Sequence, residues 1–303
     1  MSLRLEMLQA ARLATKILGE STPLVESFFR SQLRDDGGFA DRGGQSDLYY
    51  TVFGLEGLAA TGSAVPLDRV EPFLCSYGDG EGLDLVHQAC LARCWASFPA
   101  RARCDWPGRR LLARIECYRS ADGGYDLQPG NEQGSLYGCF LALGAYQDVG
   151  VEMPHSEGML NCISRLRTAD GGYTNHPDLP VGLTAAAAAA VVLHQQLAAE
   201  PDPALGQWLL QRCRPEGGFF ASPMAPVPDL LSTATALHSL DAMQVDVRAL
   251  AEPCLDFVDS LWVNRGGFYG SWEDDALDCE YAYYGLLSLG HLVVDPTEAR
   301  ADP

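Results

Sequence analysis

The sequence contains few basic residues and almost no lysine. Of its 303 residues, 40 are Asp or Glu and 21 are Lys or Arg, and Lys16 is the single lysine, so the formal net charge is −19. A chain of this charge repels polyanions, which argues against a nucleic-acid groove and against an anionic membrane surface. Long apolar runs and a secretory segment are missing as well. We therefore expect no transmembrane helix and a cytoplasmic location.

The ten cysteines follow no disulfide or zinc-finger spacing. They are scattered singly, mostly among apolar residues in segments with helical periodicity. Reduced, buried thiols are the expected state. His87, Cys90 and Cys94 share one helix face by their spacing, which leaves a metal triad open as the alternative to core packing.

A short phrase, two glycines followed by an aromatic residue, occurs five times. Its copies are Asp36–Phe39, Asp122–Tyr125, Asp170–Tyr173, Glu216–Phe219 and Arg265–Phe268. The spacing leaves room for another copy near residue 81, where the degenerate run 78–82 contains three glycines. We infer six repeats of about 43 to 49 residues. Glycine supplies positive φ, so each phrase predicts a turn at a helix C-terminus, with the aromatic packed between neighbouring repeats.

Each repeat is predicted to hold one amphipathic and one nearly all-apolar helix. The amphipathic segments are 22–33, 66–76, 107–120, 155–168, 202–213 and 247–262, and the apolar segments are 48–61, 84–97, 135–147, 182–198, 230–242 and 278–292. Helices apolar all round must be buried, so six outer helices surround six inner ones. A closed ring is favoured over an open solenoid, because a solenoid needs polar terminal repeats and the last apolar segment has none.

The expected fold class is therefore all-α, an α/α6 toroid. We predict one domain over residues 1–303, with a lead-in helix within 1–21, the repeats over 22–293 and a tail at 294–303.

This repeat resembles the one shared by protein prenyltransferase β-subunits and squalene–hopene-type terpene cyclases, over about residues 22–293. The resemblance implies a barrel whose apolar cavity holds an isoprenoid or another long apolar molecule. The chain length is closer to a prenyltransferase β-subunit, which would need a helical partner subunit. A homo-oligomer is the other assembly considered.

The resembled prenyltransferases hold zinc with an Asp-x-Cys at the fifth inner helix and a His at the sixth. Asp229 matches the Asp, Leu231 replaces the Cys, and Glu280 lies nearest to the His position. Zinc prefers N and S donors, so no cofactor is expected. Two alternatives stay open: a rearranged zinc site of Asp229, Cys279 and Glu280, and magnesium held by an acidic rim beside a diphosphate. The loop over 219–226, where that family binds diphosphate, contains no cation.

The resembled cyclases protonate their substrate from an Asp-x-Asp-Asp-Thr-Ala segment. The matching stretch, 229–234, keeps the first Asp and the Thr-Ala pair. Asp229 is one candidate acid, provided that burial raises its pKa, and the acidic run 273–275 beside Trp272 is the other. Asp also occurs at the start of most apolar segments, including Asp278, and helix capping is the competing explanation there.

We predict an isoprenoid-handling, prenyltransferase-like or terpene cyclase-like protein of altered mechanism. The candidate catalytic residues are Asp229, Asp275, Asp278 and Glu280, and the candidate substrate-binding residues are Tyr49, Tyr50, Tyr137, Trp272, Tyr281 and Tyr284. Aromatic faces can line an apolar tunnel and stabilise a carbocation. The alternative from another class is a non-catalytic lipid-binding or protein-interaction module.

Overall fold

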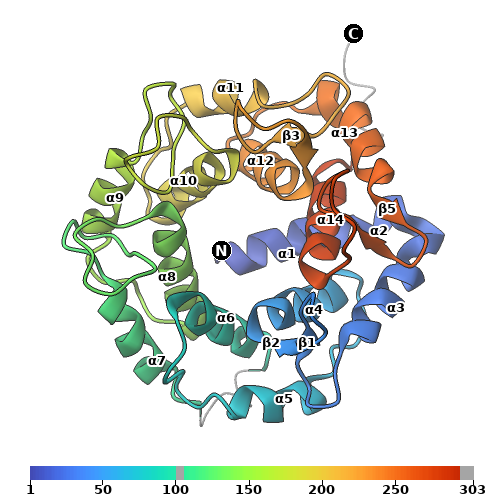
Figure 1. The fold of residues 1–303 in the computed structure, drawn as a ribbon, viewed down its shortest axis with the longest axis horizontal. Helices are drawn as coiled ribbons and strands as arrows, with labels where there is room; N and C mark the ends of the chain where they lie inside the picture. Colours follow the sequence, from blue (N-terminus) through green and yellow to red (C-terminus); the bar gives the residue numbers. More distant parts are fainter. Residues whose placement is uncertain (100–105, 294–303) are drawn as a thin grey trace.

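The computed structural model describes residues 1–99 and 106–293. Within these residues the chain is mostly helical, and the helices form two concentric layers around a central axis (Figure 1). The inner helices are α4 (Leu48–Ala60), α6 (Leu85–Ala96), α8 (Leu136–Val149), α10 (Thr184–Gln196), α12 (Leu230–Ala242) and α14 (Cys279–His291). The outer helices are α3 (Thr22–Gln32), α5 (Leu67–Cys75), α7 (Gly108–Ile115), α9 (Ser156–Arg165), α11 (Ala204–Leu210) and α13 (Arg248–Ser260). Each helix falls on a predicted segment, and the all-α toroid is confirmed.

The inner helices form a closed ring. Each packs against the next along the chain, and α14 packs against α4. The outer layer closes in the same place, because a Cβ atom on Gly266 in the last glycine turn would lie 2.1 Å from the carbonyl oxygen of Leu24 on α3. Only glycine permits so close an approach, and its φ of +90° also favours glycine. The open solenoid is therefore excluded.

The Gly-Gly turns end the outer helices as predicted. The first glycine has a positive φ in all five copies, between +89° at Gly171 and +98° at Gly217. The aromatic residue that follows is buried in every copy. Phe39, for example, packs directly on Gly54 of α4, where a Cβ atom would lie 2.1 Å from the ring. The degenerate copy lies between α5 and α6, and Gly78, Gly80 and Gly82 have positive φ there.

Short antiparallel hairpins accompany three of these turns. They are β1 (Phe39–Ala40) with β2 (Ser46–Asp47), β3 (Phe219–Phe220) with β4 (Pro228–Asp229), and β5 (Trp262–Val263) with β6 (Gly267–Phe268). The first two hairpins deliver the chain directly to the N-terminus of an inner helix. Asp47, Asp84, Asp229 and Asp278 each cap such a helix by accepting backbone N–H bonds. Helix capping, the competing explanation for this column of aspartates, is thus confirmed.

All inner helices run in one direction, so their N-termini meet at one end of the barrel. Contacts between neighbouring N-terminal ends include His87 with Asp47 and Tyr49 with Glu280. The C-terminal ends meet at the opposite end, where Gln147 binds Gln196. One end of the barrel is therefore built from helix N-termini and their capping carboxylates.

The other end is covered by the chain's own N-terminal segment. The predicted lead-in helix is two helices, α1 (Leu3–Leu13) and α2 (Thr15–Leu18), followed by the 3-10 turn η1 (Gly19–Ser21). α1 crosses the axis beneath the ring (Figure 1). It binds the C-terminal ends of several inner helices, through Leu3 N–H to Gln147, Arg4 to the Ala96 carbonyl and Glu6 to Gln196. α1 therefore forms a floor, which the sequence pattern did not predict.

No helix in the described part of the chain has the length and hydropathy needed to cross a membrane. The cysteines described by the structure are free thiols, and most are buried. Cys75 and Cys117 are exposed, so the expectation of buried thiols is wrong for these two. Cys104 lies outside the described residues.

Candidate functional site: the central cavity

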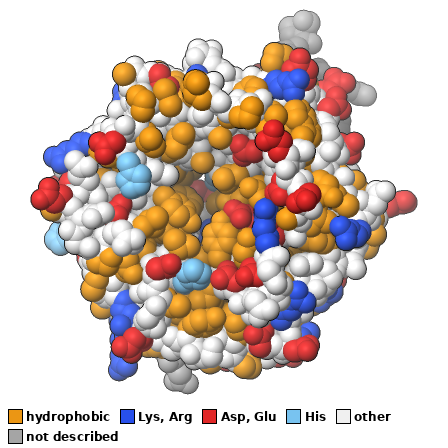
Figure 2. Space-filling view, viewed as in Figure 1, with side chains coloured by type: hydrophobic (Ala, Val, Ile, Leu, Met, Phe, Trp, Pro, Cys, Tyr) orange, Lys and Arg blue, Asp and Glu red, His pale blue; other side chains and the backbone are white. Residues whose placement is uncertain are grey.

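A cavity of about 330 Å³ occupies the axis of the barrel. Its walls come from the inner helices and its floor from Leu3, Arg4 and Met7 of α1. Figure 2 shows the open end as a hollow walled by hydrophobic side chains, with acidic, Arg and His side chains around it. The size is at the lower end of the range for pockets that bury small molecules.

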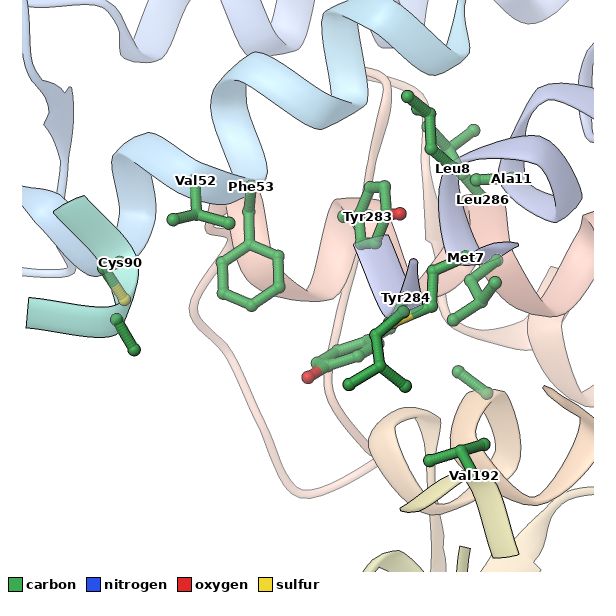
Figure 3. Close-up of a cluster of buried hydrophobic side chains, with 14 of the residues drawn as sticks. Met7, Leu8, Ala11, Val52, Phe53, Cys90, Val192, Tyr283, Tyr284 and Leu286 are labelled. Atoms are coloured by element: carbon green, nitrogen blue, oxygen red, sulfur yellow. The ribbon is translucent and has the colours of Figure 1, made fainter. Parts of the chain in front are cut away.

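Aromatic and small residues divide the wall between them. Five aromatic residues of α4, α8 and α14 line the cavity: Tyr49, Phe53, Tyr137, Phe140 and Tyr284. The Phe53 ring lies 5.0 Å from Tyr49 and 5.6 Å from Tyr284, centroid to centroid. Figure 3 shows Phe53, Tyr284 and the Met7 side chain of the floor converging. Across the axis from α4, four alanines of α10 line the cavity, so their short side chains leave room on the axis: Ala185, Ala186, Ala188 and Ala189.

Glu280 is the carboxylate at the open end of the cavity. It lines the cavity from the first turn of α14, and Tyr49 donates its O–H to Glu280 Oε1 at 2.6 Å. Burial raises the pKa of Glu280 to about 7, helped by the charge of Asp278, while the Tyr49 hydrogen bond and Arg42 oppose the shift. A pKa in this range allows Glu280 to hold or release a proton near neutral pH.

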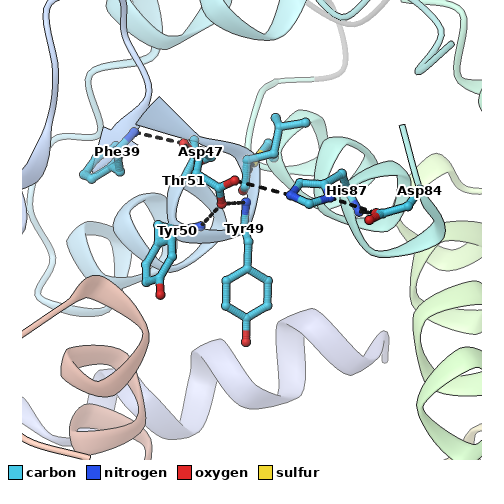
Figure 4. Close-up of polar contacts among 9 residues, drawn as sticks. Phe39, Asp47, Tyr49, Tyr50, Thr51, Asp84 and His87 are labelled. Atoms are coloured by element: carbon cyan, nitrogen blue, oxygen red, sulfur yellow. Dashed lines mark hydrogen bonds and ion pairs between the residues drawn. The ribbon is translucent and has the colours of Figure 1, made fainter. Parts of the chain in front are cut away.

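The two cations near this rim are engaged by carboxylates. Arg42 binds Asp278 at 2.7 Å and Asp274 at 2.8 Å. His87 lies between Asp84, 2.8 Å from its Nδ1, and Asp47, 3.3 Å from its Nε2 (Figure 4). The hydrogen bond with Asp47 raises the pKa of His87 to about 9, against the effect of burial, and Asp84 adds to the shift. His87 is thus an imidazolium at neutral pH, already paired.

Charged pairs also lie deeper in the barrel. Arg93 of α6 lines the cavity and donates from Nε and a terminal nitrogen to the two carboxylate oxygens of Glu56, at 2.7 and 2.6 Å. The Glu56 side chain is only 1% exposed. Arg4 of the floor lies 3.6 Å from Asp148 of α8. Both arginines that face the cavity are therefore neutralised by a buried carboxylate.

Comparisons with known proteins agree with this architecture. The model of the prenyltransferase alpha-alpha toroid domain matches residues 9–76, 106–221 and 185–299. The chain belongs to this family. A search of curated protein sequences returns no significant match.

Two solved structures have a similar fold. One is Candida albicans protein geranylgeranyltransferase-I complexed with GGPP, at 13% identity and a TM-score of 0.65, covering 92% of this chain and 97% of that chain. The other is a type II terpene cyclase from Scytonema in complex with its product, merosterolic acid A, at 12% identity and a TM-score of 0.62, covering 96% of this chain and 98% of that chain. At such identities the likeness shows the toroid fold alone.

The predicted site residues of this toroid fall into two groups. Glu280, Tyr49, Tyr137 and Tyr284 line the cavity. Asp229 does not line it; its carboxylate caps α12 and accepts bonds from the Ser232 N–H and O–H, at 2.7 and 2.8 Å. Burial raises the pKa of Asp229, and the hydrogen bonds from Ser232 oppose the shift.

The other predicted residues lie outside the cavity lining. Asp278 caps α14 and pairs with Arg42, and Tyr281 lies beneath the same guanidinium, 5.4 Å from ring centroid to carbon. Tyr50 packs edge-on against Tyr49. Asp275 is exposed on the loop before α14. Trp272 is 46% exposed and packs on Phe257 of the outer layer. In the acidic run 273–275 we expected a carboxyl with a raised pKa, and Asp274 differs from this expectation. Burial raises the pKa of Asp274, but the hydrogen bond from Arg42 opposes burial and the pKa lies below its usual value.

The donor sets proposed for a metal do not come together. Among the described residues no group of three or more His, Cys, Asp or Glu side chains is placed to hold a metal ion. In the rearranged zinc site, Cys279 is fully buried with its thiol pKa raised by burial, Asp229 is a helix cap, and Glu280 is bonded to Tyr49. In the other triad, Cys90 and Cys94 are buried while His87 binds two aspartates. Neither set fits zinc.

Several cavity residues were not singled out from the sequence. Arg93 and His238 line the wall, and Met7 lines the floor. The sequence held a usable signal for Arg93 and His238, because each is a titratable residue inside a mostly apolar inner helix. No comparable signal marked Met7, which lies outside the repeats.

Proposed function

We propose that this chain is a proton-initiated isoprenoid cyclase that binds its substrate in the central cavity. The observation that carries the proposal is Glu280, a largely buried carboxyl with a pKa of about 7 that faces an apolar cavity walled by aromatic rings. A general acid works best when its pKa lies near the operating pH. The GGPP and merosterolic acid complexes of the two similar structures support an isoprenoid as the ligand class.

In the proposed reaction, protonated Glu280 donates its proton to the end of the isoprenoid held at the open end of the cavity. If that end is an alkene, its π electrons form the new C–H bond and leave a carbocation. The electrons of the next double bond then form the ring. If the end is an epoxide, the proton goes to oxygen and the C–O bond breaks. The Tyr49 hydrogen bond, 2.6 Å long, stabilises the carboxylate that remains on Glu280.

The aromatic wall suits the cation that follows. Phe53, Phe140 and Tyr284 line the cavity beyond Glu280, and the faces of aromatic rings attract cations. An enclosed apolar site also excludes the water that would quench such an intermediate. Its floor, α1, closes the one end through which water would otherwise enter from below.

Transfer of a prenyl group from a diphosphate is less compatible with this site. A diphosphate leaving group needs unpaired cations to take up its charge. The cations on the cavity wall and rim, Arg4, Arg42, His87 and Arg93, are each paired with a carboxylate in the described part of the chain. Helix N-termini at the open end would also attract an anion, but aspartates already cap most of them.

The test is cyclisation in deuterated water. Farnesol, geranylgeraniol, squalene and oxidosqualene are each incubated with the protein, and products are analysed by gas chromatography with mass spectrometry. We expect an isomer of one substrate. An alkene-initiated product carries one solvent deuteron in a new C–H bond, whereas an epoxide-initiated product carries it on an exchangeable hydroxyl. Glu280→Gln keeps the carboxyl's shape but cannot donate a proton, so its turnover should fall at least 100-fold, on the order of a general acid's contribution.

Asp229→Asn is the matched control. It changes a carboxylate at the start of the neighbouring inner helix that does not line the cavity, so we expect turnover within about threefold of the native rate. Equal losses in both variants would contradict the assignment to Glu280. Binding of an isoprenoid without any product, in native protein and variants alike, would instead favour a non-catalytic carrier.

A further inference from the structure

A pair of histidines connects the cavity wall with the outside of the barrel. His238 of α12 lines the cavity, and its Nδ1 lies 3.0 Å from Nε2 of His291 at the end of α14. Nδ1 of His291 lies 3.4 Å from Oδ2 of Asp241. The side chain of His291 is 5% exposed and that of Asp241 is 71% exposed. The three side chains therefore form a row from the cavity to solvent.

The row fixes where the protons sit. A carboxylate only accepts hydrogen bonds, so the contact with Asp241 assigns the proton of a neutral His291 to Nδ1 and makes its Nε2 an acceptor. His238 must then donate from Nδ1 to His291. This leaves Nε2 of His238 as an unprotonated nitrogen, and that atom is buried without a hydrogen-bond partner. An unsatisfied buried acceptor is costly and needs an explanation.

His238 stays neutral at rest. Burial lowers the pKa of His238 to about 3, with the neighbouring His291 adding to the shift and Asp241 opposing it. Thr235 lies one turn earlier on the same wall and donates its hydroxyl hydrogen to the Leu231 carbonyl oxygen. It therefore does not donate to Nε2 of His238. A neutral imidazole of low basicity does not take a proton from Glu280, but it suffices for a carbocation, which is a far stronger acid.

The two titratable groups of the cavity lie at different depths. Glu280 is the second residue of α14 and His238 the ninth of α12, and the two helices run in the same direction. At 1.5 Å of rise per residue this places His238 about 10 Å deeper. A chain bound along the axis would thus meet the carboxyl at one end and the imidazole further along.

We propose that His238 is the base that ends the reaction, with His291 and Asp241 as positioning residues; this rests on the proposed cyclase function. The cyclised cation loses a proton from the carbon next to the cationic centre, and the electrons of that C–H bond form the new double bond. The proton binds Nε2 of His238. The imidazolium is stabilised by the lone pair of His291 Nε2 and, through it, by Asp241. Glu280 regains a proton and His238 loses one to solvent when the product leaves, so substrate and product are isomers.

The test compares products rather than rates. In His238→Asn, the share of the native alkene among the products should fall on the order of tenfold or more, in favour of other isomers or a water-captured alcohol, whatever the change in total substrate consumption. Asp241→Asn and His291→Asn should shift products in the same direction but less. His194→Asn is the matched control, because His194 lies in the adjacent inner helix and binds a backbone carbonyl instead.

A second measurement does not need turnover. In protein labelled with nitrogen-15 histidine, His238 should show a protonated Nδ1 and an unprotonated Nε2 throughout the neutral range, and Asp241→Asn should disturb this pattern. A native product mixture in His238→Asn, or an Nε2-protonated His238, overturns the assignment while leaving the cyclase proposal standing. Absence of any cyclised product from native protein overturns both, even if the tautomer is as expected.

Discussion

Shortening Met7 should lengthen the ligand that the barrel accepts. Met7 is the floor residue that faces the cavity beside Tyr284, and its side chain is 8% exposed. Met7→Ala removes three heavy atoms from the floor and deepens the cavity along its axis. Each further methylene that a ligand buries contributes about 0.8 kcal/mol. Three such groups give about 2.4 kcal/mol, or roughly 50-fold in affinity.

The measurement is the ratio of dissociation constants for geranylgeraniol and farnesol, taken by displacement of a fluorescent isoprenoid. We expect Met7→Ala to move this ratio about 50-fold toward geranylgeraniol. Leu8→Ala is the matched control, since Leu8 is also buried in α1, 5% exposed, but does not line the cavity. It should destabilise the packing of α1 without moving the ratio. An unchanged ratio in Met7→Ala, or an equal change in Leu8→Ala, would refute the floor as the limit on ligand length.

Three further predictions concern stability. Glu56→Gln leaves Arg93 buried without its counter-charge and should cost about 3–5 kcal/mol, seen as a lower thermal midpoint, whereas Glu26→Gln in an exposed pair should cost under about 1 kcal/mol. Because the folded pKa of Glu280 is raised, native stability should decline between about pH 4.5 and 7, by up to about 3 kcal/mol, and Glu280→Gln should lack this decline in urea titrations. The raised pKa of His87 stabilises the fold below about pH 6.5, and this contribution is lost as the pH rises through about 9. Solvent screening limits the contribution to about 1 kcal/mol, and His87→Asn should abolish this loss of stability with pH.

The repeats were predictable because their signals are local. A glycine pair follows five of the six outer helices within a few residues, and an inner helix is recognised because it is apolar on nearly every face. Ring closure followed from the same apolarity, since an uncovered last helix is unstable. Glu280 and the cavity-lining tyrosines could be predicted because they lie in the first two turns of inner helices, and the N-terminal ends of these helices meet at one end of a ring.

The rest depended on contacts between distant residues. Glu6 binds Gln196, and His238 binds His291, across separations that leave no periodic trace in the sequence. Asp229 illustrates the opposite difficulty. The same residue type in the same place serves either as a helix cap or as a catalytic acid, and only the direction of its carboxylate distinguishes them.

Closure of the ring has a consequence for synthesis on the ribosome. The side of α4 that packs against α14 stays exposed while the more than two hundred residues between the two helices are synthesised. Nascent chains that stop before α14 therefore expose an uncovered apolar surface at each end, which promotes aggregation. Such premature fragments should be ready clients for chaperones, and the finished protein should show little partial unfolding, because opening any one seam exposes two surfaces at once.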